Sequence, residues 1–171
     1  MSKIAENKYR DVDLGSLRIS DVGKKVKLAG WVNDIRKLGG LTFATLRDMY
    51  GITQVIFKEN EEVSLNKEDV VSITGTVIER ESKNPNMPTG DIEVTVESIT
   101  MLGKCTQVLP FEIKGSDKVS EEMRLKYRYL NLRADYNQKM LKLRSDLLLF
   151  VRNYMHNNAF TEVQTPILTA S

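Results

Sequence analysis

The sequence is poor in cysteine and histidine, with one residue of each, Cys105 and His156, in a chain of 171. A single cysteine cannot build a disulfide framework, and one Cys with one His cannot supply the ligands of a zinc site. We therefore expect a fold without covalent or metal support that suits a reducing compartment. Cys105 itself is predicted to be a half-buried residue at the end of a strand.

Long apolar runs are also missing. No stretch approaches the roughly 20 apolar residues that cross a membrane, and residues 1–8 lack the apolar centre of a signal peptide. These absences favour a cytoplasmic protein with no membrane partner. Charge is nearly balanced, at a net +2, so a nucleic-acid partner can be argued only from where the basic residues lie.

Between about Ser16 and Thr106 the sequence alternates apolar and polar residues in short runs that turn residues separate. This pattern is typical of an all-β region. Turns are expected at Gly39-Gly40 and Tyr50-Gly51, and a short helix near residues 59–69. The predicted strands lie around residues 26–32, 41–48, 52–57, 70–81 and 91–101. Five strands with a helical segment between the third and fourth follow the order of an OB-fold barrel.

After Pro110 the apolar period lengthens from two residues to between three and four. A first helix is predicted from Ser120 through Tyr129, with acidic residues in its first turn. A second helix is predicted to begin at Asp135, which could cap it with Gln138 as its capping-box partner, and Asn157-Asn158 could end it. Its apolar residues form one stripe that needs a partner surface: Met140, Leu143, Leu147, Phe150, Val151 and Tyr154.

The last twelve residues, 160–171, follow this helix. Val163, Thr165 and Ile167 share one alternation phase, and Pro166 removes a backbone donor, which favours a strand at a sheet edge. A lone edge strand is a poor end for a domain. We therefore interpret the chain as the front part of a larger protein. Residues 1–107 would be one complete domain, residues 108–134 a linker, and residues 135–171 the start of a second domain.

An aromatic ring and an amide are predicted on one face of the barrel. Phe43 lies on the polar phase of its strand, and Gln54 lies on the outer phase of the next strand. A ring on an OB sheet can stack on an unpaired base, and an amide can read a base edge. The alternative is that Phe43 packs beneath a loop.

Four further residues could complete a site on this face. Strict alternation puts Arg36 on the inward phase, so a bend or bulge near Gly30 or Asn33 is needed to turn it outward. Glu93 lies on the polar phase of the last strand, and Arg80 and Asn84 border the loop before it. Arginine binds guanine acceptors or phosphate, and glutamate accepts from guanine donors. Each residue alone would more often be a solvated surface residue, but together they make a candidate nucleic-acid site.

Several segments resemble one family. Residues 30–43, 46–48, 51–57 and 75–77 resemble the anticodon-binding OB domain of class II aminoacyl-tRNA synthetases of the aspartate, asparagine and lysine subgroup. Residues 124–133 and 160–171 resemble the linker and motif 1 of the bacterial aspartyl enzymes. Against this resemblance the sequence departs at Asp34, where a basic residue is usual, and at Ile56 and Asn131.

The resemblance implies an OB fold followed by the first helix and strand of an α+β catalytic domain. It implies ATP-dependent formation of aspartyl adenylate, transfer of aspartate to its tRNA, Mg²⁺, and a homodimer. No nucleophile elbow or Walker loop occurs in the sequence. We therefore expect no catalytic or metal-binding residue in this chain, and expect it to bind tRNA without ATP or catalysis of its own.

The resemblance also assigns roles to the candidate residues. Phe43 would stack on the central anticodon base, and Gln54 would read that region. Arg36 and Glu93 would recognise the first, guanine-type base. Arg80 and Asn84 would contact the third base or nearby backbone. The dimer interface would include Phe150, Tyr154 and Pro166.

Two other interpretations stay open. The chain could come from an asparaginyl- or lysyl-tRNA synthetase, because amino-acid choice is made by catalytic-domain residues outside it. An aspartate enzyme could also charge asparagine tRNA as well as its own. The second alternative is a free-standing OB-fold nucleic-acid-binding module, which leaves the apolar helix stripe and Pro166 without a role.

Overall fold

The computed structural model describes residues 7–58 and 64–167. The chain divides into two compact units, residues 1–108 and residues 109–171. Each unit is described by itself.

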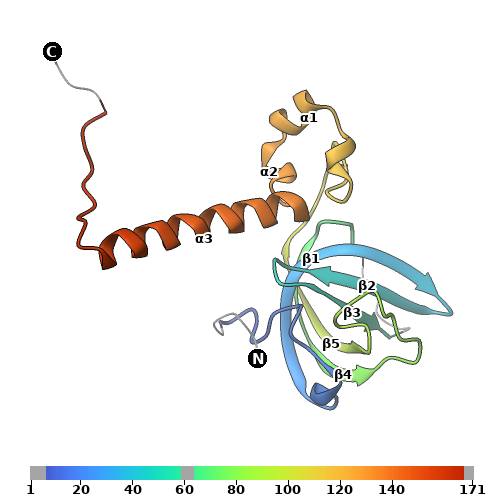
Figure 1. Ribbon diagram of the computed structural model, residues 1–171. Helices are drawn as coiled ribbons and strands as arrows, with labels where there is room; N and C mark the ends of the chain where they lie inside the picture. The colour runs from blue at the N-terminus through green and yellow to red at the C-terminus, as the bar shows by residue number, and fades with distance from the viewer. Residues whose placement is uncertain (1–6, 59–63, 168–171) are drawn as a thin grey trace. The chain divides into compact units, whose positions relative to one another are not determined.

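The first unit is a barrel of five strands in the described residues (Figure 1). The strands are β1 (Lys25–Leu38), β2 (Leu41–Arg47), β3 (Ile52–Phe57), β4 (Val70–Glu79) and β5 (Ile92–Gly103). Their spatial order is β1-β2-β3-β5-β4, and β4 pairs with β1 to close the barrel. Neighbours are antiparallel except β3 and β5, which are parallel. The predicted five-stranded OB fold is confirmed.

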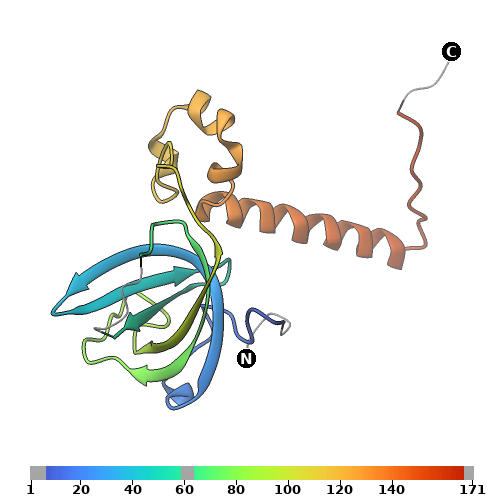
Figure 2. The same cartoon turned by 180° about the vertical axis from the view of Figure 1, so that it is seen from behind.

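β1 and β2 form a tight hairpin. Leu38 pairs with Leu41, so Gly39 and Gly40 are the two loop residues, with φ angles of 59° and 81°. Two positive φ angles are the requirement of a type I′ hairpin turn, and glycine meets it without steric cost. β1 runs on to Leu38, well beyond its predicted end, and Figure 2 shows it curving along the barrel.

The barrel core follows from the two-residue period of the strands. In β3 the side chains of Thr53, Val55 and Phe57 are buried and those between them are part-exposed, as expected when every second residue points inward. Burying these apolar side chains is the main stabilising term for such a barrel. The largest fully buried apolar residues of the first unit are Leu14, Leu28, Val32, Leu46, Val55, Phe57, Val71, Ile73, Val77, Ile92 and Val94.

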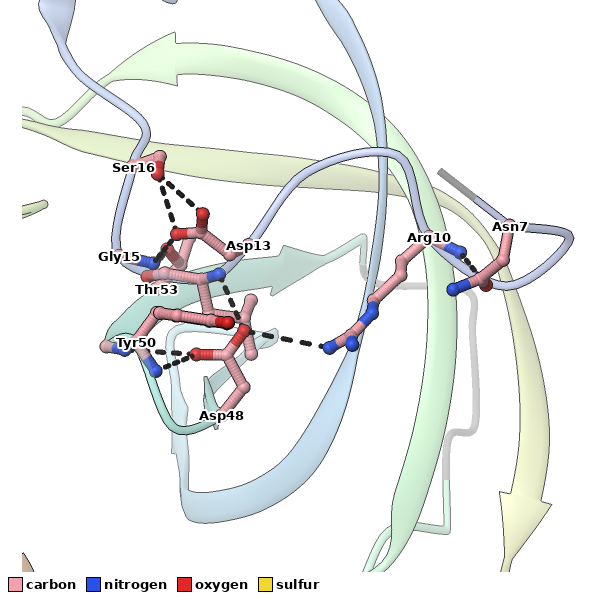
Figure 3. Close-up of polar contacts among 10 residues, drawn as sticks. Asn7, Arg10, Asp13, Gly15, Ser16, Asp48, Tyr50 and Thr53 are labelled. Atoms are coloured by element: carbon pink, nitrogen blue, oxygen red, sulfur yellow. Dashed lines mark hydrogen bonds and ion pairs between the residues drawn. The ribbon is translucent and has the colours of Figure 1, made fainter. Parts of the chain in front are cut away.

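The segment before β1 is fastened to the barrel at Asp48, just after β2 (Figure 3). The Asp48 carboxylate accepts hydrogen bonds from the backbone N–H groups of Tyr50 (2.7 Å), Gly51 (3.0 Å) and Leu14 (3.1 Å). Thr53 adds a hydrogen bond from Oγ1 to the Leu14 carbonyl. These bonds seat the Leu14 side chain, which is fully buried in the core. A 3₁₀ turn, η1 (Ile19–Asp21), then leads into β1.

The helix predicted near residues 59–69 is not found where the structure can be described. Residues 59–63 lie outside the described residues, and residues 64–69 contain a turn at Lys67 and Glu68. Glu68 has a φ of 69°, in the left-handed region, which an α-helix does not contain. The prediction is therefore wrong for residues 64–69.

The second unit is helical over most of its length. It contains a 3₁₀ turn η2 (Ser116–Lys118), α1 (Glu121–Lys126), α2 (Arg128–Asn131) and α3 (Asp135–Asn157). The predicted first helix is divided at Tyr127, whose φ and ψ of −111° and 48° lie outside the helical region. No helix among the described residues is long and apolar enough to cross a membrane.

The ends of α3 differ from the prediction in detail. The residue that caps α3 is Ala134, whose carbonyl accepts from the Gln138 N–H, so Asp135 already lies inside the helix. The Gln138 side chain instead donates to the Leu132 carbonyl. The predicted capping box is therefore wrong. At the other end Asn158 is the cap, as expected, while the left-handed residue is Ala159, with a φ of 65°.

Residues 158–167 form no strand, so the predicted edge strand is wrong over its described part. The physical reason is that a strand needs a hydrogen-bonding neighbour, and no described segment pairs with these residues.

Candidate nucleic-acid interface

A β-bulge in β1 turns Arg36 to the outside of the barrel. The β1–β2 register shifts between Val32 and Asp34, so Asn33 is the extra residue. Before the bulge Val32 points into the core, and after it Ile35 packs against the core while Arg36 is exposed. The bulge predicted near Gly30 or Asn33 is therefore confirmed at Asn33.

Phe43 lies beside Arg36 on this outer face. The two residues are direct partners in the β1–β2 ladder, and Ile56 of β3 is the partner of Phe43 on its other side. Side chains of directly opposed residues point to the same face of a sheet. Because Ala44 is the buried neighbour of Phe43, the Phe43 ring belongs to the outer face, where it is part-exposed.

The second row of the same face holds a polar network. Thr45 of β2 is the partner of Gln54 of β3. The Gln54 Nε2 donates a hydrogen bond of 2.7 Å to Oε2 of Glu93 on β5. Nε of Arg80, just beyond β4, lies 3.9 Å from the same oxygen. Gln54 and Arg80, from two separate segments of the chain, therefore converge on the carboxylate of Glu93.

The Glu93 carboxylate is more buried than the place of Glu93 on the polar phase of its strand suggested. The expectation was a solvent-facing group, but Glu93 is only 7% exposed and the Arg80 side chain only 14%. Burial raises the pKa of Glu93, and the Gln54 hydrogen bond and the Arg80 charge offset part of that rise. Nη1 of Arg80 is buried and, among the described residues, has no hydrogen-bond partner.

Asn84 is engaged within its own loop. Its Oδ1 accepts from the Asn86 N–H at 3.0 Å, and its N–H donates to the Gly90 carbonyl at 3.0 Å. A Cβ on Gly90 would meet the Asn84 carbonyl oxygen, so glycine is required at this close approach. In the described chain no hydrogen bond joins Asn84 to Glu93 or Arg80. The structure thus brings together Arg36 with Phe43, and Gln54 with Glu93 and Arg80, and leaves Asn84 outside both groups.

The arrangement offers several chemical functions to a single-stranded nucleic acid. The Phe43 ring can stack on a base, and Arg36, whose side chain is 82% exposed, can reach phosphate. The Gln54 amide and the Glu93 carboxylate can exchange their mutual hydrogen bond for bonds to a base edge.

Sequence reasoning missed three residues beside this face. Thr45 could have been found from its alternation phase. Glu68, which forms a two-pronged ion pair with Arg47, and Lys67, which lies 3.6 Å from Asp34, come from the turn before β4. Because both contacts join residues far apart in the sequence, no local sequence pattern reveals them.

The residues predicted for a dimer interface lie in the second unit. Phe150 and Tyr154 are 65% and 59% exposed on α3, with their rings stacked at a centroid distance of 6.4 Å. The whole predicted stripe is exposed, each member by at least 46%. Pro166 is exposed and lies outside any helix or strand.

Comparison with known proteins identifies relatives for both units. Residues 26–102 match the family described as OB-fold nucleic acid binding domain, and residues 120–171 match the tRNA synthetases class II (D, K and N). The aspartate–tRNA ligase of Bacteroides thetaiotaomicron is 45% identical over 95% of this chain. The chain is homologous to the aspartate–tRNA ligases. It spans about 29% of the length of that ligase and a similar share of the other relatives.

A further ligase and two solved structures are also similar to the chain. The aspartate–tRNA(Asp/Asn) ligase of Gluconobacter oxydans is 41% identical over 95% of the chain and 28% of its own length. The crystal structure of asparaginyl-tRNA synthetase from Pyrococcus horikoshii has a TM-score of 0.73 and 31% identity, over 88% of this chain and 36% of that one. Aspartyl tRNA synthetase from Entamoeba histolytica, at 23% identity, shares the fold, with a TM-score of 0.82 over 92% of this chain and 39% of that one.

Proposed function

We propose that the barrel binds the anticodon of a tRNA as part of an ATP-dependent aspartate–tRNA ligase. The observation that carries the proposal is the convergence of Gln54, Glu93 and Arg80 on the same OB face as Phe43 and Arg36. An unpaired anticodon base needs both a stacking surface and polar groups for its edge, and this face offers the two together. The homology to aspartate–tRNA ligases supports the same reading.

Within this proposal each residue has a role. Phe43 stacks on the central base, with Gln54 beside it. Glu93 and Arg36 recognise a guanine-type first base, because a carboxylate can accept from the guanine amino and imino groups. Arg80, whose buried Nη1 has no hydrogen-bond partner among residues 7–58 and 64–167, contacts the third base or nearby backbone, and the Asn84 loop borders it.

The remaining parts of the ligase reaction are assigned to a longer protein. There aspartate would be activated with ATP and Mg²⁺ and then transferred to the tRNA, in the cytoplasm. The described residues contain no group of three or more His, Cys, Asp or Glu side chains that could hold a metal ion. We assign the use of ATP and Mg²⁺ to that longer protein and derive no catalytic step from this chain.

We further propose that residues 108–134 are a linker and that residues 135–171 begin a catalytic domain that forms a homodimer. The support is the exposed stripe of α3, which includes Phe150 and Tyr154. Six exposed apolar side chains on one helix form a surface that a soluble protein normally covers. Pro166 would join this interface once residues 163–167 have a strand to pair with.

The anticodon proposal is tested by titrating the 171-residue chain with a fluorescent RNA stem-loop that carries the aspartate anticodon GUC. Phe43→Ala should weaken binding about tenfold or more, because stacking on an aromatic ring contributes on the order of 1–3 kcal/mol per base. Phe160→Ala is the matched control, since it removes an exposed ring outside the barrel and should leave binding unchanged. Equal affinities for both variants, or for a stem-loop with a scrambled anticodon, would overturn the proposal.

Two alternatives involve asparagine, and each has a relative: the Gluconobacter ligase, named for both Asp and Asn, for a dual-specificity enzyme, and the Pyrococcus asparaginyl enzyme for an asparagine enzyme. By the genetic code the asparagine anticodon, GUU, differs from the aspartate anticodon at the third base only. A preference for the GUC stem-loop that is lost in Arg80→Ala would support aspartate specificity. Equal binding of both stem-loops by the parent chain would favour a dual-specificity enzyme.

A further inference from the structure

The turn before β4 is hydrogen-bonded to the bulge of β1. The Glu68 N–H donates to the Val32 carbonyl, and the Val32 N–H donates to the Asp69 carbonyl, each at 2.8 Å. Within the turn the Asp69 carboxylate accepts from the Asn66 N–H at 2.7 Å. Lys67 therefore extends from a fixed position beside β1.

An ion pair adds to this attachment. Both guanidinium nitrogens at the end of Arg47 lie 2.7 Å from the Glu68 carboxylate oxygens. The pair is largely buried, with side chains 14% and 11% exposed. Glu68 has a positive φ, which costs energy for any residue other than glycine. A turn that keeps Glu68 in an unfavourable backbone conformation points to a requirement for the position of the neighbouring residue, Lys67.

Lys67 and Arg36 meet at one carboxylate on the outer face. Asp34 Oδ1 lies 3.6 Å from Nζ of Lys67, and Asp34 Oδ2 lies 3.6 Å from Nε of Arg36. The cationic side chains are 57% and 82% exposed, and Asp34 is 37% exposed. Asp34 partners Thr45 in the ladder, and Arg36 partners Phe43. The cluster of Asp34, Arg36 and Lys67 therefore borders the proposed base-stacking ring.

We propose that Lys67 is a phosphate contact of this interface and that Asp34 competes with the RNA for Lys67 and Arg36. The inference rests on the proposed anticodon-binding function and adds a residue that binds the backbone next to the stacked base. Lys67 lies on a segment adjacent to the strand that carries Arg36 and pairs with the strand of Phe43, and a single-stranded RNA backbone presents phosphates beside its bases.

Whether Asp34 strengthens or weakens RNA binding follows from the exposure of the cluster of Asp34, Arg36 and Lys67. Exposed ion pairs contribute little to the placement of long side chains. A carboxylate within contact distance of both cations, in contrast, repels an incoming phosphate and occupies the groups that would bind it. Removal of the Asp34 charge should therefore tighten RNA binding.

The test measures the affinity of the 171-residue chain for the GUC stem-loop over a series of salt concentrations. Lys67→Ala should weaken binding about threefold and make the slope of log K against log salt shallower by about 0.7, the value for one contact to a single-stranded phosphate. Asp34→Asn should strengthen binding on the order of threefold at low salt. Lys25→Ala is the matched control, because Lys25 is 64% exposed, pairs with a carboxylate, and lies at the other end of β1.

The outcomes separate this inference from the function beneath it. If Lys67→Ala and Lys25→Ala change affinity and slope equally, only net charge matters and Lys67 is no contact. If Asp34→Asn weakens binding, the competition is wrong. In both cases a large effect of Phe43→Ala would leave anticodon binding intact. Absence of any anticodon-dependent binding by the parent chain would overturn both proposals.

Discussion

Nε2 of Gln54 donates a 2.7 Å hydrogen bond to Oε2 of Glu93, joining β3 to its parallel neighbour β5 on the outer face of the barrel. The bond occupies the two groups that are best suited to read a base edge. In the free protein the Gln54 amide and the Glu93 carboxylate are therefore hydrogen-bonded to each other. A base must break this bond and take the place of one of the two groups. The exchange depends on the charge of Glu93, because only an ionised carboxylate is purely an acceptor.

The first prediction concerns pH. Burial raises the pKa of Glu93 above that of an ordinary carboxyl group, so this residue takes up a proton at a higher pH than an ordinary carboxyl group does. Affinity for a GUC stem-loop should decline as pH drops through the raised pKa. In Glu93→Gln, binding should be weaker at neutral pH and nearly constant over the same interval. Parallel pH profiles for the two proteins would show that protonation of the RNA, or of another residue, causes the decline.

The raised pKa of Glu93 also affects the stability of the folded chain. RNA affinity should decrease as pH falls, whereas the contribution of Glu93 to stability should increase. With a raised pKa the folded chain binds the Glu93 proton more tightly than the unfolded chain does. The free energy of unfolding contributed by Glu93 therefore falls as pH rises from the ordinary carboxyl pKa through the raised one. Urea denaturation of the parent chain and Glu93→Gln, compared across this interval, should show the difference between them growing with pH in favour of the variant.

A second prediction concerns Asp48, whose carboxylate accepts three backbone N–H groups. Asp48→Ala leaves these donors without their acceptor and should reduce the free energy of unfolding by about 3 kcal/mol. Asp48→Asn keeps one acceptor oxygen and should cost less. Hydrogen exchange of the Leu14 amide reports the attachment directly and should be faster in both variants. The exposed Asp91 provides the control, since Asp91→Ala should change neither measurement.

Much of the barrel could be predicted because its strands and turns are specified by residues that are adjacent in the sequence. The two-residue period of β3 and the Gly39-Gly40 turn each follow from a few adjacent residues, and both match the structure. The bulge at Asn33 was also predictable, because Arg36 would otherwise lie on the phase of buried Val32. A charged residue on a core phase is itself a signal.

Other features of the structure could not be predicted from the local sequence pattern. Whether Glu93 is buried depends on Gln54 and Arg80, which come from different strands, and sequence alternation gives a side chain's face but not what covers it. Lys67 reaches Asp34 only because the turn before β4 packs on the bulge. The capping box at Asp135 failed because Ala134 already supplies the first helical acceptor. The strand at residues 163–167 failed because pairing needs a neighbour.

A third prediction tests the ion pair that fixes the turn. Removing one partner from a buried pair leaves an uncompensated charge. Because Arg47 and Glu68 keep slight solvent contact, Arg47→Met should lower the free energy of unfolding by about 2 kcal/mol, less than for complete burial. A double-mutant cycle with Glu68→Gln should give a clear coupling energy by urea denaturation. The exposed pair Lys83 and Glu79 is the control, and its cycle should give a coupling near zero. Equal coupling for the two pairs would mean that Glu68 holds its conformation without Arg47.

The last prediction concerns the exposed stripe of α3. Isolated helices are marginal in water, and packing of an apolar face supplies most of their stability in proteins. In dilute solution the backbone amides of residues 140–154 should therefore exchange rapidly, and protection should grow with protein concentration as stripes from two chains meet. Leu147→Ser should raise the dimer dissociation constant about tenfold, because one buried anchor of this size contributes roughly 1–2 kcal/mol. Lys139→Ser, which alters an exposed residue of the same helix outside the stripe, should leave the constant unchanged. Strong protection of α3 that is independent of concentration and insensitive to Leu147→Ser would mean that the helix is stable without a partner, and the proposed dimer would lose its main support.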